Sequence, residues 1–386
     1  MSCLAQRSNV VAALGTTQTL AWASSYYLPA ILADHMAAAA GVSRAWVFGA
    51  FSAALLLTAF VGPAVGRMID RRGGSRVLVV SNLVFAVGLV GLGASQGLAG
   101  LFVAWGVLGL AMALGLYDAA FATLAGIYGR DARGPITGIT LIAGFASTVG
   151  WPLTALLDAQ IGWRGTCFAW AAAHLLIALP LNLWLIPGAR HHAEQKPQAT
   201  VSWEPRREMI LLAYVFAASW FVTGAMAAHL PALFERMGAT TVEAVAAAAL
   251  VGPAQVAARL AEFIVMRRAH PLVSARIAAS MHPIGAAILA IIGAPAVAAF
   301  ALLHGAGNGL LTIARGTVPL ALFGPEGYGA RTGLLGAPAR AAQATSPLLF
   351  GVLLDMMGAN VLLVSGGLCL SALAALLVLR PSRHGR

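Results

Sequence analysis

Three charged residues, Asp118, Arg315 and Arg340, lie deep inside long apolar stretches of this 386-residue sequence. A charge near the centre of a membrane-spanning helix costs about 2.5–3.5 kcal/mol on insertion scales, so such residues are rare. They usually face a polar interior, where they bind a solute or relay a proton. These three residues are therefore the first candidates for chemistry.

A polar stripe is predicted on one side of a helix over residues 296–322. Four residues follow the helical spacing i, i+4, i+8, i+11: His304, Asn308, Thr312 and Arg315. Arg340 and Gln343 lie one turn apart in the next apolar stretch. Guanidinium groups bind planar anions through paired hydrogen bonds. We therefore predict that Arg315 and Arg340, with Asn308 and Gln343, bind the anionic group of a small solute.

Aromatic residues form a second candidate group. Gln18, Trp22 and Tyr26 share one helical face, Tyr27 follows directly, and Tyr117 precedes Asp118. We predict three tyrosines and one histidine as further solute-binding residues: Tyr26, Tyr27, Tyr117 and His229. Two alternatives stay open. The aromatic residues could form ordinary packing contacts, and Arg315 could pair permanently with Asp118.

Asp118 and His304 are predicted to bind a coupling proton. Imidazole titrates near physiological pH, and a carboxyl group withdrawn from water holds its proton more readily. His229 could serve the same purpose, and the alternative for both histidines is a structural hydrogen bond. The three cysteines have neither the spacing of a metal site nor that of a disulfide framework. The pair His191-His192 is interpreted as solvated loop residues, so we predict neither a metal nor a cofactor.

Composition places these residues in a membrane protein. The chain is 60% hydrophobic and 10% charged, with a mean hydropathy of +0.83, whereas soluble domains are about 25% charged. A helical span needs about 20 apolar residues. Twelve stretches qualify: 9–33, 45–66, 76–96, 99–125, 135–158, 164–186, 208–234, 242–266, 273–293, 296–322, 332–356 and 360–379. They leave no room for a separate soluble domain.

The net charge of +11 would suggest nucleic acid as the partner of a soluble protein. Here the arginines are concentrated in alternate loops and both tails, with Arg44, Arg164 and Arg236 the exceptions in the other loops. This asymmetry predicts that both termini are cytoplasmic. The basic charge therefore indicates membrane orientation, and we expect no nucleic-acid partner.

Weak internal similarity predicts two related halves. Tyr27-Leu28-Pro29-Ala30 recurs as 229–232, and Gly62-Pro63-Ala64 recurs as 252–254. Arg67 to Asp70 is echoed, without the glycine turn, by Arg259 to Glu262. These matches keep their order, as in parallel-repeat transporters. We predict an N-terminal six-helix bundle over 1–186, a linker over 187–207 and a C-terminal six-helix bundle over 208–386.

A basic loop carries a family resemblance. Residues 66–73 fit Gly-x-x-x-Asp-Arg-x-Gly, with Gly66, Asp70, Arg71 and Gly73 at the defined positions, directly after the second apolar stretch. Residues 128–134 contain Arg133-Gly134 directly before the fifth stretch, and this segment is similar to one found in the same family as the loop motif. The chain resembles the major facilitator superfamily of secondary transporters, of the bacterial type.

The resemblance implies two six-helix bundles that alternate access to a central site. It also implies a conformational latch formed by Gly66, Asp70, Arg71, Gly73 and Arg133. We expect an all-α inner-membrane monomer, embedded in the lipid bilayer, that moves a small organic anion such as a monocarboxylate, coupled to protons or a counter-solute. Efflux of amphipathic drugs or other toxic compounds is the alternative. Neither the motifs of an enzyme nor those of an ATP-binding loop are found, and a channel is not expected.

Overall fold

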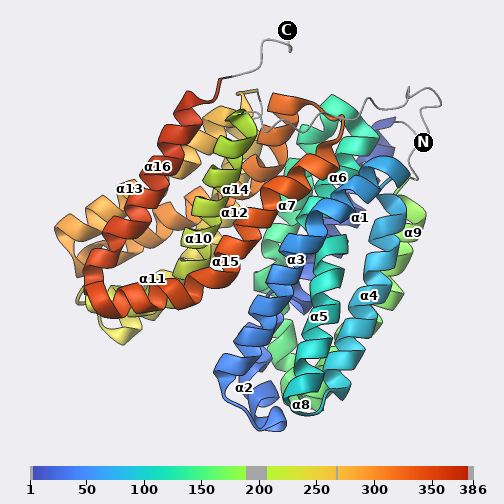
Figure 1. Cartoon of the computed structure of the whole chain (residues 1–386), viewed down its shortest axis with the longest axis horizontal. Helices are drawn as coiled ribbons and strands as arrows, with labels where there is room; N and C mark the ends of the chain where they lie inside the picture. Colours follow the sequence, from blue (N-terminus) through green and yellow to red (C-terminus); the bar gives the residue numbers. More distant parts are fainter. Residues whose placement is uncertain (1–2, 188–206, 267, 381–386) are drawn as a thin grey trace. The chain divides into compact units, whose positions relative to one another are not determined.

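The computed structural model describes residues 3–187, 207–266 and 268–380, and every regular element in these ranges is a helix (Figure 1). The chain divides into two compact units. The first unit contains Met1–Ser202 and Gly324–Ala337, and the second contains Trp203–Phe323 and Pro338–Arg386. The predicted linker lies almost wholly outside the described residues, together with His191 and His192. The predicted bundle boundaries stay a prediction.

In its described residues, the first unit contains nine α-helices and the beginning of a later one, besides the short helical turns 129–132, 143–145 and 174–178. They are α1 (Cys3–Ser24), α2 (Leu28–Ala40), α3 (Arg44–Arg72), α4 (Ser75–Ala94), α5 (Gly97–Gly115), α6 (Tyr117–Tyr128), α7 (Arg133–Ile142), α8 (Ala146–Ala173) and α9 (Leu179–Leu185), with the first residues of α15 (Tyr328–Met357). The α3, α4 and α5 helices lie side by side (Figure 1).

Several predicted spans are broken where the sequence disfavours a continuous helix. The first span is divided into α1 and α2, because Pro29 near the start of α2 lacks an N–H and clashes with the preceding turn. The α5 helix ends at Gly115 and α6 begins at Tyr117, with the extended Leu116 between them. Within α8, Gly162 has φ 72° and separates the fifth span from the sixth.

The second unit contains the remaining helices. They are α10 (Arg207–Arg236), α11 (Thr241–Ala249), α12 (Val251–Ala261), α13 (Pro271–Ile292), α14 (Val297–Phe323), the later part of α15, and α16 (Val361–Val378). Thr240 caps α11 in a reciprocal capping box with Glu243. The α13 helix lies beside both α14 and α16, and Phe234, Phe300 and Phe350 are fully buried in the core of the second unit.

The helices account for the predicted spans. Among the described residues, eight helical stretches are long and apolar enough to cross a membrane, and the two longest, Gly97–Leu185 and Tyr328–Val378, contain three and two predicted spans respectively. Together the eight correspond to eleven of the twelve predicted spans, and the remaining first span is formed by α1 and α2. The prediction of an all-α fold with twelve spans is confirmed.

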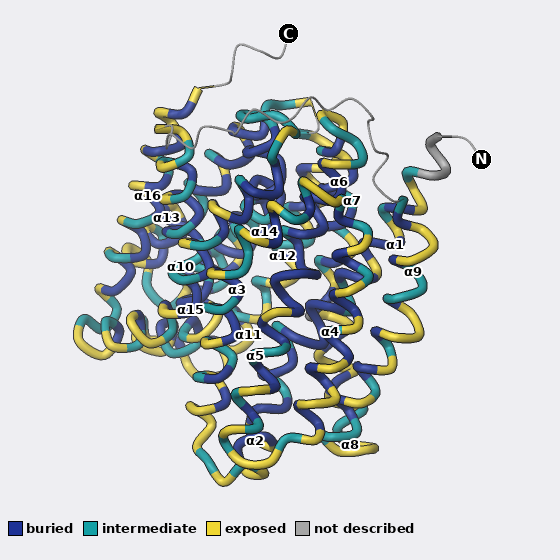
Figure 2. Tube along the Cα trace, turned by 45° about the vertical axis from the view of Figure 1, so that its right-hand side comes forward, coloured by how far each residue is buried: buried dark blue, intermediate teal, exposed yellow. Residues whose placement is uncertain are grey.

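Large apolar side chains cover the outer faces of these helices. Phe60, Trp184 and Ile291 are 81%, 78% and 83% exposed, and Figure 2 shows exposed positions recurring along most helices. In water such a surface would be strongly unfavourable, whereas lipid chains solvate it. Several polar side chains, among them Gln18, His174, Arg315 and Arg340, are by contrast buried inside the two units.

Candidate functional site

The aromatic candidates of the first unit form one connected cluster. The ring centroid of Trp22 lies 5.1 Å from that of Tyr26, 6.2 Å from that of Tyr27 and 5.1 Å from that of Tyr117. Tyr26 and Tyr27 follow the end of α1 and contact each other edge to face, with their ring planes nearly perpendicular at 86°. Trp22 and Tyr117 are buried, while Tyr26 and Tyr27 are half-buried. The cluster is therefore partly packing and partly available surface.

The interruption between α5 and α6 shapes the surroundings of Asp118. Gln18 of α1 donates a hydrogen bond from Nε2 to the carbonyl of Gly115, at 2.5 Å, where α5 ends. Asp118 lies in the first turn of α6, and the N-terminal end of a helix favours negative charge. Tyr117 stacks on Phe121 one turn later. The break thus gives an acid in the middle of a predicted span a favourable electrostatic position.

The side chains of the predicted polar stripe of α14 do not all face the same neighbouring helices. Thr223 of α10 donates to Oδ1 of Asn308 at 3.1 Å, and the guanidinium of Arg315 lies 4.6 Å from the ring centre of Trp220. Thr312 accepts a hydrogen bond from Arg259 of α12. His304, however, faces α13. The stripe therefore contacts α10 and α12 over three of its members and α13 at the fourth.

The two candidate arginines are buried in the second unit. Arg315 is 5% exposed and Arg340 is 7% exposed, and Gln343 beside Arg340 is buried as well. Pro347 lacks an N–H, which leaves the carbonyl of Gln343 without its usual helical donor. The hydroxyl of Ser346 donates to that carbonyl at 2.9 Å. The α15 backbone is thus kept satisfied close to the guanidinium of Arg340.

His229 is attached to the backbone of α15. Its Nε2 donates to the carbonyl of Pro347 at 2.7 Å, because a carbonyl can only accept. This bond fixes the Nε2–H tautomer and leaves Nδ1 as the lone pair. The ring also stacks near Phe350, at 6.1 Å between centroids. His229 therefore has a structural contact and one nitrogen that could still accept a bond.

The loop motif contacts the N-terminal end of α15, within the first unit. Asp70 Oδ1 accepts the backbone N–H of Gly329 at 2.8 Å, and Oδ2 accepts that of Ala330 at 2.7 Å. These are groups that a helix start leaves without an internal partner. Gly73 ends α3 with φ 80°, and its N–H donates to the carbonyl of Ile69. Arg71 is exposed and Arg133 begins α7.

Four glycines allow α3 to approach α15 backbone to backbone. A Cβ at Gly66 would lie 2.0 Å from the carbonyl oxygen of Gly329, and a Cβ at Gly333 would lie 2.7 Å from that of Gly62. The two glycines of each helix, Gly62 and Gly66 in α3 and Gly329 and Gly333 in α15, have the spacing Gly-x-x-x-Gly, which permits close helix approach in membranes. The sequence contained this signal, since Gly62-Gly66 and Gly329-Gly333 both have the spacing, but the motif was interpreted only through its loop.

The echo of the loop motif in the second half has a different role. Arg259 donates to Oε1 of Gln255 and to Thr312, inside the second unit. Glu262 begins a π-helical turn, Glu262–Met266, and is only 1% exposed. The hydroxyl of Ser274 lies 3.5 Å from its Oε1. The echo is thus an interior polar contact and no second copy of the Asp70 cap.

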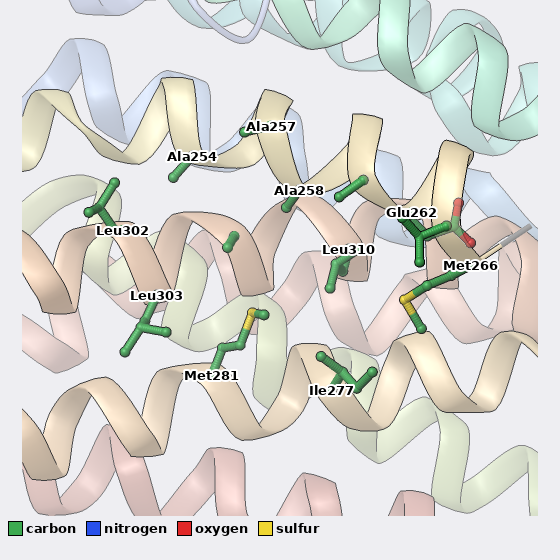
Figure 3. Close-up of a pocket in the computed structure, with 13 residues that line it drawn as sticks. Ala254, Ala257, Ala258, Glu262, Met266, Ile277, Met281, Leu302, Leu303 and Leu310 are labelled. Carbon is green, nitrogen blue, oxygen red and sulfur yellow. The ribbon is translucent and has the colours of Figure 1, made fainter. Parts of the chain in front are cut away.

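An open groove of about 570 Å³ lies between α12, α13 and α14 (Figure 3). Its wall is almost entirely apolar, with Leu302 and Leu303 at one end and Glu262 and Met266 at the other (Figure 3). None of the residues predicted to bind solute lines it. In the described part of the chain, no three metal-ligating side chains gather.

Two buried histidine clusters were missed by the sequence analysis. His174 accepts from the hydroxyl of Ser24 at Nε2, at 2.9 Å, and donates from Nδ1 to Oδ1 of Asn82, at 3.0 Å. In the second unit, Nδ1 of His282 lies 3.0 Å from Nδ1 of His304. Each cluster joins different helices, so no spacing along one helix could have predicted it.

Comparisons with known proteins agree with this architecture. Residues 14–303 match the sequence profile of the Major Facilitator Superfamily. No curated protein sequence matches the chain. The fold is similar to the crystal structure of the human organic anion transporter MFSD10 (TETRAN), with 16% identity and a TM-score of 0.73 over 97% of this chain and 100% of that one. It is also similar to a variant of the E. coli fucose:proton symporter FucP, with 14% identity and a TM-score of 0.72 over 95% and 97%.

Proposed function

The chain belongs to the major facilitator superfamily of multi-pass membrane transporters, and from this membership we propose that it carries a small organic anion, such as a monocarboxylate. Transport would proceed by alternating access, coupled to a proton or counter-solute gradient. The observation that carries the proposal is the burial of two guanidinium groups, those of Arg315 and Arg340, in one unit of an otherwise apolar protein.

Arginine suits this role better than lysine would. Its planar group donates paired hydrogen bonds to a carboxylate and remains charged at any physiological pH. The guanidinium of Arg315 lies 4.6 Å from the ring centre of Trp220, within the range of a cation–π contact. Asn308, Gln343 and the Nδ1 atom of His229 are further polar groups of the same unit that we assign to solute binding. The similarity in fold to a human organic anion transporter is consistent with this assignment.

We assign the tyrosines of the first unit to contacts with the apolar body of a solute. Tyr26 and Tyr27 are half-buried and Tyr117 is packed on Trp22, so the rings of Tyr26 and Tyr27 are available for such contacts. Asp118 at the start of α6 and His304 are the groups that we assign to proton coupling. A proton-coupled relative in fold is the fucose:proton symporter.

The contact of Asp70 with α15 would act as the conformational latch. Its two hydrogen bonds go to backbone N–H groups, and the absence of a side chain at Gly66 allows the close approach that they require. Gly73 would define the turn, and Arg71 and Arg133 would provide exchange partners for Asp70 when α15 withdraws. We further propose a monomer in a bacterial inner membrane with both termini in the cytoplasm, orientated by its arginine-rich loops.

Efflux of amphipathic drugs is the second candidate. The observation that favours it is the aromatic cluster around Trp22, because half-buried tyrosines can stack on flat apolar compounds. Such a transporter would use Asp118 to attract a cationic group and would have no need for two buried arginines.

A thermal-shift screen distinguishes the two candidates. Small carboxylates are tested beside their own carboxamides, and cationic drugs form the third group. A ligand that binds the folded state raises its unfolding temperature by mass action. Stabilisation by carboxylates but not by their amides supports the anion proposal, and it should be lost in Arg340→Ala. Stabilisation by cationic compounds alone would reject it. The matched control is Arg276→Lys, since Arg276 donates only to the backbone carbonyls of Leu376 and Leu379.

A further inference from the structure

Two histidines from different helices of the second unit are in direct contact. His282 of α13 and His304 of α14 have their Nδ1 atoms 3.0 Å apart, and their ring centroids are 5.0 Å apart at an interplanar angle of 73°. Both side chains are buried, at 4% and 6% exposure. Phe300 stacks on His304 and meets His282 edge to face. The pair is therefore held in a site with apolar walls.

The 3.0 Å contact fixes where the protons lie in the neutral pair. One Nδ1 must carry a hydrogen and donate it, and the other must be a lone pair that accepts it. The donating ring is then bare at Nε2, and the accepting ring carries its hydrogen at Nε2. The neutral pair thus holds two ring protons, one of them shared.

Only one further proton fits. It can bond to the bare Nε2 of the donating ring, and the shared hydrogen bond then persists with a charged donor, which strengthens it. A second added proton would have to occupy the accepting Nδ1. Two N–H groups would then face each other at 3.0 Å with two positive charges. The geometry limits the uptake of the pair to a single proton.

One nitrogen of the pair, Nε2 of His282, is available to bind that proton. Nε2 of His282 is buried and has no hydrogen-bond partner among the residues that the structure describes. A buried polar nitrogen without a partner is uncommon, because its loss of hydration is not offset. An imidazole at position 282 is therefore better explained by a function than by a contribution to stability.

Ionised groups on the surrounding helices make other contacts. On α13, Arg276 donates to backbone carbonyls of Leu376 and Leu379, and on α14, Arg315 lies over Trp220. Other ionisable groups on the neighbouring helices make contacts that include the following: Arg259 with Gln255 and Thr312, Glu262 with Ser274, Glu243 with Thr240, Tyr214 with Ser371, His229 with Pro347, and Arg236 with Asp355.

Further ionisable groups on these helices include Arg207, at the start of α10, and Arg340 of α15. Glu208 lies in the first turn of α10, Glu235 is exposed near its last turn, and Cys369 is the ionisable residue of α16. In the described part of the chain, neither imidazole is hydrogen-bonded to a carboxylate or a guanidinium. The charge of the pair is therefore governed by the two rings themselves.

We propose that His282 and His304 together form a proton-binding site that takes up one proton per transport cycle. The proposal rests on the proposed proton-coupled function and names its site as a two-histidine unit, in which His282 is as necessary as His304. Binding of the proton places one positive charge between α13 and α14. The pair is thereby expected to respond to the opening and closing of the second unit to water, which changes the hydration of that charge.

Nitrogen-15 NMR of histidine-labelled protein tests the site without any solute. The nine histidines of the chain are assigned with the variants His282→Asn and His304→Asn. We expect the two rings to change together on acidification, in one step that adds one proton to the pair. Two independent steps, or no protonation of either ring, would overturn the proposal. His174→Asn is the burial-matched control and should leave that step unchanged.

Transport assays test the coupling. Each variant is reconstituted with the carboxylate that stabilises the wild-type protein, and proton-driven accumulation is compared with exchange of labelled for unlabelled solute. His282→Asn should abolish accumulation and retain exchange, since exchange moves no net proton. Accumulation that is intact in both histidine variants would overturn the coupling role. Absence of any stabilising carboxylate would instead reject the proposed substrate class, while the NMR titration still decides the site.

Discussion

Asp70 accepts the backbone N–H of Gly329 at 2.8 Å, although 259 residues separate the two in the sequence. The second oxygen of the same carboxylate accepts the next N–H, that of Ala330. The loop that carries the family motif is thus a helix cap supplied from outside the helix. A side chain used in this way combines two hydrogen bonds with the favourable field of a helix N-terminus.

Replacing Asp70 with Asn should weaken the cap while keeping the fold. Asparagine has one acceptor oxygen and no charge, so we expect a loss of about 1 kcal/mol in the interaction with α15. The balance between inward-open and outward-open states should change with it. Accessibility of single cysteines placed in the site measures that balance. Asp131→Asn, at an exposed position, is the control, and equal accessibility in both variants would show that Asp70 is only a loop charge.

Gly66→Ala should be strongly disruptive. The new methyl group would lie 2.0 Å from the carbonyl oxygen of Gly329, so the two helices must separate. We expect destabilisation of about 1–3 kcal/mol or more, as for overpacked cores. Gly49→Ala in the same helix meets nothing within 4 Å and should stabilise by about 0.5–1 kcal/mol. The unfolding temperatures of both variants in detergent test this prediction. Equal unfolding temperatures would contradict the close approach of α3 to α15 at Gly66.

Arg340→Lys should keep some transport, and Arg340→Ala should abolish it. Lysine preserves the charge but loses the paired donors, and a hydrogen bond to a charged group contributes about 1.5–3 kcal/mol. An affinity loss of about tenfold or more is therefore expected for Lys in an uptake assay. Normal uptake by the Ala variant would remove Arg340 from the solute site.

Arg315→Ala separates a binding role from a structural one. If Arg315 binds solute, the variant should remain stable and fail to transport. If it is instead the partner of a buried acid, the variant should be destabilised, and adding Asp118→Asn should restore much of the loss. Expression stability and uptake of the two single variants and the double variant distinguish these outcomes. A stable double variant with normal transport would exclude Arg315 from solute binding.

His174→Ala should reduce stability without affecting coupling. The change removes two hydrogen bonds and leaves the buried groups of Ser24 and Asn82 without their partner. Each unsatisfied group costs about 1–3 kcal/mol. The unfolding temperature should fall, while the ratio of accumulation to exchange should match that of the wild type. A change in that ratio would mean that His174 takes part in proton movement.

Hydropathy predicted the helices because lipid exposure leaves a long uninterrupted signal in the sequence. The α14 and α16 helices, for example, match their predicted spans to within a few residues. Breaks inside a span were harder to predict. Pro29 and Gly162 are visible in the sequence, yet proline and glycine also occur within unbroken helices, as Pro283 does in α13.

Contacts between helices could not be predicted from periodicity. His282 is a single histidine in an apolar stretch, and its partner lies 22 residues away on another helix. The α14 stripe was predicted to face one side, but His304 turns to α13 while Asn308 contacts α10. The internal repeat aligned Arg259 to Glu262 with Arg67 to Asp70, but without the glycine turn of the motif. The structure places those side chains in the interior, because a π-helical turn replaces the glycine turn of the first half.

The α15 helix has a mechanical consequence. It is continuous from Tyr328 to Met357, and its residues up to Ala337 group with the first unit while those from Pro338 group with the second. A continuous helix is stiff in torsion, so a twist applied to its later part is transmitted along the backbone to the N–H groups that Asp70 holds. Pro338 and Pro347 cannot donate to the carbonyls four residues earlier, so the helix bends most readily at these two positions. Along the backbone, Pro338 is the proline that lies between Arg340 and the N–H groups of Gly329 and Ala330 that bind Asp70.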